Sequence, residues 1–148
     1  MVIPHLVEIL QLRWRYTNKK MKVKLNFNKK DLDENKLKLI SNFIHFLNVE
    51  FPLKKDITIL CKSESDEGMT TGSDNHGVIK VLCKGRMLID VLRTLAHEWV
   101  HEHQYQYERK QTKQDIGGPD EDEANAEAGK LLKIFAKQNP NKEDKMYE

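Results

Sequence analysis

The feature that most constrains this chain is the segment 86–109, in which apolar residues recur at helical spacing. Residues three, four and seven positions apart share one side of an α-helix, so an apolar stripe of this kind must be buried against other elements. The stripe consists of Leu88, Val91, Leu92, Leu95 and Trp99. A second helix is predicted from near Asp120 to before Pro140, because the sequence Gly117-Gly118-Pro119 interrupts the chain between the two.

The residues before this segment predict a small sheet with one further long helix. Polar and apolar residues alternate over 22–27, while 56–60 and 78–83 are short β-branched or apolar runs, and each of these patterns is typical of a strand. Helical spacing and an acidic first turn predict a helix over 31–47. A short helix is predicted over 4–16, and the Gly-, Ser- and Asp-rich segment 63–77 is predicted to be a loop.

The predicted class is therefore α+β, with a small twisted sheet packed on two later helices. A length of 148 residues suits one domain. Its expected parts are an N-terminal extension (1–20), a helix and sheet region (21–85), two helices that carry a site (86–139) and a tail (140–148).

Charge and composition narrow the classes of function. The net charge is only +2, and no apolar run approaches the roughly 20 residues of a membrane span. The first residues lack a cationic leader and a cleavage site, so we expect a cytoplasmic protein without a membrane partner. Cys61 and Cys83 each end an apolar run and are predicted to be reduced, semi-buried thiols; a single bridge is the alternative.

His97-Glu98-Trp99-Val100-His101 is an HExxH sequence, a pattern typical of zinc peptidases. Residues four apart on a helix lie about 40° apart around its axis, so both imidazoles can reach one metal ion on the side opposite the apolar stripe. Glu98 lies about 100° around from His97, where it can reach a water on the metal without being a ligand. His103 lies about 240° around and is expected to be a surface or structural residue.

A catalytic zinc site needs a third protein ligand and one open position. Of the acids that begin the last helix, Glu121 shares a face with Ala124, Asn125 and Ala128, and that face continues as apolar residues suited to helix packing. Glu123 points the opposite way, and Glu127 lies towards the side. Glu121 is therefore the predicted third ligand. Asn125, one turn later, is predicted to accept the free ring N–H of His101.

The sequence HEWVH, followed after residues 102–120 by Glu121-x-x-Ala124-Asn125, resembles the gluzincin metallopeptidases and their small, ImmA-like members. Over Val78 to Asn139 the chain is also similar to short zinc peptidase-like proteins of tailed phages. The resemblance implies a minimal zincin-like domain, one Zn²⁺ per chain held by His97, His101 and Glu121, and a location in the host cytoplasm if phage-encoded. It also implies that strand 78–83 forms an exposed edge of the cleft, where an extended peptide can bind.

The expected function is hydrolysis of peptide bonds in a peptide or protein substrate, with Glu98 as general base. The donor that stabilises the oxyanion is left open among His76, Arg86, Tyr105 and Tyr107. Two alternatives remain. One is a non-catalytic zinc protein that regulates or binds a host protein. The other, less favoured, is a nucleic-acid-binding protein that uses the basic, aromatic segment 13–30.

Overall fold

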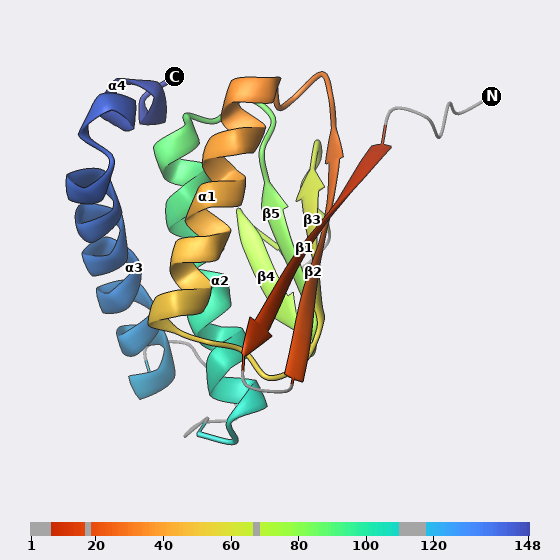
Figure 1. Ribbon diagram of the computed structural model, residues 1–148, viewed down its shortest axis with the longest axis vertical. Helices are drawn as coiled ribbons and strands as arrows, with labels where there is room; N and C mark the ends of the chain where they lie inside the picture. Colours follow the sequence, from red (N-terminus) through yellow and green to blue (C-terminus); the bar gives the residue numbers. More distant parts are fainter. Residues whose placement is uncertain (1–6, 17–18, 67–68, 110–117) are drawn as a thin grey trace.

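The computed structural model describes residues 7–16, 19–66, 69–109 and 118–148, and over these it is an α+β fold with a five-stranded mixed sheet (Figure 1). The strand order is β1-β2-β3-β5-β4. β1 and β4 run antiparallel to their neighbours, while β2, β3 and β5 are parallel. The strands are β1 (Val7–Tyr16), β2 (Lys19–Asn28), β3 (Ile57–Lys62), β4 (Gly72–Asn75) and β5 (Val78–Leu82).

The helix predicted over residues 4–16 is wrong: residues 7–16 form β1, which pairs with β2 and is an edge of the sheet rather than an extension. The apolar residues Leu10, Leu12 and Trp14 alternate with polar ones, and the register places them opposite Leu25, Val23 and Met21. Alternation of this kind suits a half-buried strand. The basic segment 13–30 thus belongs largely to this hairpin, with residues 17–18 outside the described part.

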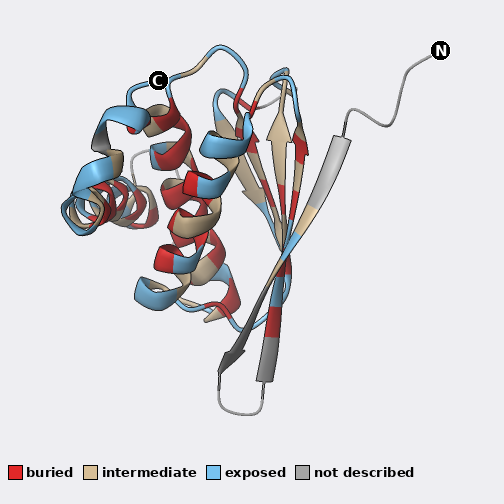
Figure 2. Ribbon diagram, turned by 45° about the horizontal axis from the view of Figure 1, so that its top comes forward, coloured by how far each residue is buried: buried red, intermediate tan, exposed pale blue. Residues whose placement is uncertain are grey.

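The predicted strand over 22–27 and helix over 31–47 are confirmed as β2 and α1 (Glu34–Glu50). Alternate residues of β2, from Met21 to Phe27, are buried, whereas Lys22 and Lys24 between them are exposed. Figure 2 shows buried residues gathered where the helices and the sheet meet. The helix α1 forms the crossover between the parallel strands β2 and β3, and the side chain of Asp33 caps it by accepting from the Lys36 N–H.

The two helices that matter most for the site are α2 (Leu88–Gln106) and α3 (Pro119–Gln138). The predicted apolar stripe of α2 is confirmed as buried, and the Trp99 indole N–H donates to the Phe51 carbonyl oxygen at 2.8 Å. α2 contacts β4 and β5 on one side and α3 on another. The short helices η2 (Pro140–Lys142) and α4 (Glu143–Met146) follow, and Met146 is buried in the core.

The loop predicted over 63–77 contains β4, and β4 rather than strand 78–83 is the edge strand beside α2. β5 is paired on both sides, with β3 and with β4. The two-residue turn His76-Gly77 joins β4 to β5 with φ of 42° and 93°, as a tight hairpin requires. The sequence did not predict β4 because its residues do not alternate with apolar ones, and a short edge strand does not need such alternation.

Cys61 and Cys83 are free thiols, half-buried and buried respectively, as predicted. Their mutual hydrogen bond and burial raise the pKa of the Cys61 thiol well above its usual range. Among the described residues, no helix has the length and apolar character needed to span a membrane.

Candidate metal centre

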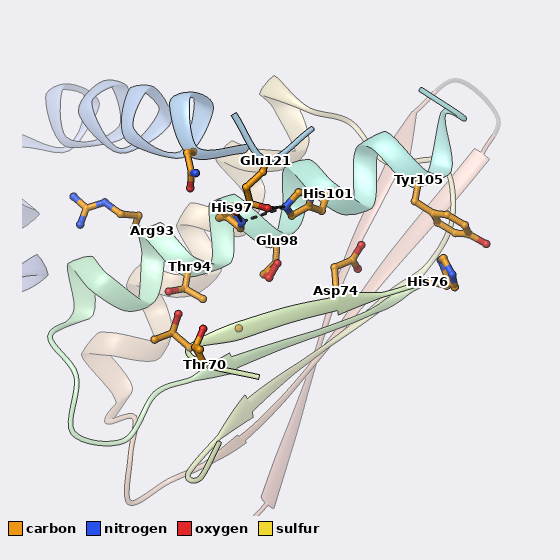
Figure 3. A pocket seen from close by; sticks show the side chains of 13 residues that line it. Thr70, Asp74, His76, Arg93, Thr94, His97, Glu98, His101, Tyr105 and Glu121 are labelled. Atoms are coloured by element: carbon orange, nitrogen blue, oxygen red, sulfur yellow. Dashed lines mark hydrogen bonds and ion pairs between the residues drawn. The ribbon is translucent and has the colours of Figure 1, made fainter. Parts of the chain in front are cut away.

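Helices α2 and α3 bring together the three predicted ligands, His97, His101 and Glu121 (Figure 3). The two imidazole Nε2 atoms lie 3.2 Å apart. One carboxylate oxygen of Glu121 lies 2.9 Å from Nε2 of His97, and the other lies 3.0 Å from Nε2 of His101. All three side chains are partly exposed, at 20%, 11% and 29%, so the cluster is open to solvent on one side.

This donor set fits a metal ion. Two neutral imidazole nitrogens and one carboxylate are a common set of protein ligands for catalytic zinc. Ligand atoms bound about 2.0–2.1 Å from a tetrahedral ion lie about 3.3 Å from one another. The Nε2–Nε2 separation of 3.2 Å is close to that value, and the two carboxylate oxygens of Glu121 lie 2.9 and 3.0 Å from one imidazole nitrogen each. Within the described part of the chain, His97, His101 and Glu121 are the one group of three His, Cys, Asp or Glu residues whose ligand atoms lie close enough together to hold a metal ion.

The surroundings of His97 favour its neutral imidazole, which is the form that binds a metal ion. Burial lowers the pKa of His97 below its ordinary value, and the neighbouring Glu121 carboxylate opposes that shift. The His101 cation, when present, acts in the same direction as burial. A lowered pKa leaves the imidazole of His97 neutral near pH 7, and only a neutral imidazole carries the lone pair that a metal ion needs.

The predicted bond between Asn125 and the His101 ring is wrong. The Nδ1–H of His101 donates instead to the amide oxygen of Gln104 at 2.8 Å, within α2 itself. Asn125 is exposed and its side chain hydrogen-bonds to His97. The sequence prediction placed Asn125 on the correct face of α3. The rings of His97 and His101 are one turn apart on α2, however, and Asn125 contacts His97 instead of His101.

The side chain of Glu98 lies between its own helix, α2, and the edge strand β4. It is 6% exposed, and it lines a cleft of about 620 Å³ together with the three ligands. The cleft is narrow here because β4 approaches α2 at Gly72: a Cβ on Gly72 would lie 3.2 Å from Cγ of Glu98 and closer still to Cγ2 of Thr94. The predicted general base thus faces the space in front of the metal ligands (Figure 3).

Of the four residues considered as donors to an oxyanion, His76 and Tyr105 line the cleft, with their rings 4.0 Å apart. Arg86 is engaged elsewhere, with the carbonyl oxygens of Leu82 and Asp90 and the Thr94 hydroxyl. Tyr107 stacks on His103, outside the cleft lining.

Sequence reasoning missed several polar residues that line the cleft, namely Thr70, Thr71, Asp74, Arg93 and Thr94. The first three lie on or beside β4, within the segment that the sequence predicts to be a loop. Nothing in that prediction places them near α2. Arg93 and Thr94 precede His97 by four and three residues, and that spacing could have placed them beside the ligands.

His103 lies outside the cluster, as predicted. Its Nδ1 accepts from Nε of Arg109 at 3.0 Å, and its ring packs edge-on against Phe51. Burial and the nearby Arg109 charge lower the pKa of His103 to about 4. Its neutral ring is therefore part of the packing at the end of α2.

A scan of the chain against models of known protein families finds no match, and no curated protein matches it either. The fold and the site together define a small α+β protein with a His-His-Glu cluster that can hold a metal ion.

Proposed function

We propose that this protein is a zinc-dependent metallopeptidase whose zinc ligands are His97, His101 and Glu121. The observation that carries the proposal is the position of Glu98, a buried carboxylate that faces the cleft beside a completed set of three ligand atoms. A purely structural zinc site is closed by four protein ligands, so it has no open position beside which a general base would act. The resemblance of the HExxH and Glu-x-x-Ala-Asn sequences to gluzincins supports the same reaction.

The protein's own residues then have defined tasks. When bound, zinc lowers the pKa of a coordinated water towards about 7 and polarises the carbonyl of the substrate. Glu98 is the residue that would take a proton from a water in the cleft and return it to the leaving amine. His76 and Tyr105, the two of the four candidate donors that line the cleft, are the proposed donors to the developing oxyanion.

The outer edge of β4, the last strand in the order of the described sheet, is the proposed place for the substrate's main chain. β4 is bonded to β5 along one side and lines the cleft through Gly72 and Asp74. An extended peptide can add to such an edge by main-chain hydrogen bonds, which bring a peptide bond to the metal without requiring a particular side chain. A peptide or protein is therefore the proposed substrate class.

The test compares the zinc-loaded protein with its Glu98→Gln variant on a library of peptides, with cleavage read by mass spectrometry. Glu98→Gln should keep one zinc per chain and lose cleavage by about 10²–10⁴-fold, the usual contribution of a general base. Glu50→Gln, an exposed acid at the end of α1, is the matched control and should cleave normally. Loss of zinc in Glu98→Gln would make Glu98 a ligand and the mechanism wrong.

Absence of cleavage by zinc-loaded wild type would favour the alternative of a non-catalytic zinc protein. The nucleic-acid alternative uses a segment that lies at the opposite edge of the sheet from β4. Binding to DNA or RNA that weakens steeply with added salt would support it.

A further inference from the structure

Gln104 is a buried amide that joins the metal centre to the start of α3. It is 1% exposed, and all its bonds are made within the protein. Its oxygen accepts from Nδ1–H of His101 at 2.8 Å. Its nitrogen donates to the Asp120 carbonyl oxygen at 3.0 Å and to a Glu123 carboxylate oxygen at 2.7 Å.

The chemistry of these partners fixes the orientation of the amide. A carbonyl oxygen and an ionised carboxylate only accept hydrogen bonds, so the NH₂ group of Gln104 must face Asp120 and Glu123. The amide oxygen then faces His101 and can only accept. The Nδ1 atom of His101 must therefore carry a proton, which leaves the neutral ring's Nε2 lone pair directed at the metal cluster.

A second layer holds Gln104 in place. Nη1 of Arg109 donates to both carboxylate oxygens of Glu123, at 2.6 and 2.8 Å. These two bonds hold the Glu123 carboxylate in one orientation, because charge-assisted hydrogen bonds are short and strong. Arg109, Glu123, Gln104 and His101 thus form one continuous chain of hydrogen bonds from the end of α2, through the first turns of α3, to the metal ligand.

We infer that Gln104 is a positioning residue that fixes the tautomer and the ring orientation of His101, and that the Glu123–Arg109 pair fixes Gln104 in turn. The inference rests on the proposed role of His101 as a zinc ligand. A partner of a ligating histidine typically contributes about 10–100-fold to metal affinity or activity. Glu123 is accordingly part of the site's support, although it is not a ligand.

The experiment measures two quantities in wild type, Gln104→Leu and Gln106→Leu. The first is zinc affinity, by competition with a chelator. The second is the His101 Nδ1–H resonance, by proton–nitrogen correlation NMR with and without zinc. Gln106 is the matched control: it is a buried glutamine of the same helix that bonds to Glu102, Lys54 and Lys55 instead of a ligand.

Gln104→Leu should weaken zinc binding about 10–100-fold and remove the protected Nδ1–H resonance. Gln106→Leu should lower the stability of the fold and leave both readouts unchanged. The variant Glu123→Ala removes a partner that holds Gln104 but keeps the amide that faces His101, so it should weaken zinc binding by a smaller factor than Gln104→Leu and shift the resonance. It also serves as the decisive variant if Gln104→Leu does not fold.

An unprotected Nδ1–H in wild type, or equal losses of zinc affinity in the two leucine variants, would overturn the inference. If wild type binds no zinc, the proposed function fails, and the NMR resonance still decides the role of Gln104. If zinc binds and Gln104→Leu weakens it while no peptide is cleaved, the peptidase proposal fails and the inference stands.

Discussion

His103 shows how one side chain can make the stability of this fold depend on pH. Its Nδ1 accepts from Arg109, so protonation breaks that bond and places two cations side by side. The folded protein holds the pKa of His103 at about 4, below its ordinary value of 6.5. Between these values the unfolded chain binds more protons, so stability from this group is complete above pH 6.5 and is lost as pH falls towards 4.

The predicted loss is on the order of 2 kcal/mol after allowance for the ring's partial exposure. It is measured by urea unfolding of chelator-treated protein at pH 7 and pH 4, with His103→Gln as the comparison. Glutamine keeps an acceptor for Arg109 but does not titrate, so the variant should lose less stability than wild type over this range. An equal loss in both proteins would contradict the assignment.

At the residue scale, helical geometry was enough to predict that His97, His101 and Glu121 meet, since their positions depend only on faces of α2 and α3. The partner of His101 could not be predicted in the same way. Asn125 lies on the predicted face of α3, but which ring it meets depends on how α3 packs against α2. The available signal was an amide three residues after the second histidine, a spacing at which side chains of one helix meet.

At the scale of elements, the contact between β4 and α2 determines the width of the cleft. Gly72→Ala would place a methyl group against Thr94, the Lys80 carbonyl oxygen and Glu98. The strand should shift away from the helix, with a cost of about 1–3 kcal/mol in the free energy of unfolding, as for other overpacked sites. Cleavage should fall while zinc affinity stays, because the ligands lie on α2 and α3.

Gly129→Ala is the matched control. Gly129 lies in the middle of α3, with nothing within 4 Å of an added Cβ. Alanine there should stabilise the protein by about 0.5–1 kcal/mol, the usual difference between the two residues in a helix. Thermal unfolding of both variants checks the pair. A Gly72→Ala protein as stable and active as wild type would show that β4 does not closely approach Glu98.

The elements themselves were predicted unevenly. The helices α1, α2 and α3 and the strands β2, β3 and β5 carry strong local patterns, and the sequence places each of them correctly. β1 was mistaken for a helix because Ile9, Leu10 and Leu12 also suit helical spacing, and its strand form depends on pairing with β2. β4 consists of a glycine and three polar residues, and its conformation comes from the His76-Gly77 turn and from contact with α2.

At the scale of the whole molecule, the proposed metal centre joins segments that are distant in the sequence. α2 carries two of the proposed ligands and α3 the third, while residues 110–117 between the helices lie outside the described part. Only the folded chain brings Glu121 to the histidines, so a bound ion stabilises the folded state, by about 4 kcal/mol when free metal exceeds its Kd a thousandfold. The stability of the fold and the proposed activity would therefore both depend on the bound metal ion.

Zinc titration of wild type, Glu121→Ala and Asp122→Ala tests this account most directly, with stoichiometry read by native mass spectrometry and affinity by chelator competition. Asp122 is the exposed neighbour of Glu121 on the same helical turn and makes a better control than Glu123, which supports Gln104. Wild type and Asp122→Ala should bind one zinc per chain with similar affinity, and Glu121→Ala should bind far more weakly. Equal affinities in the two variants, or no zinc bound by wild type, would contradict the assignment of the centre.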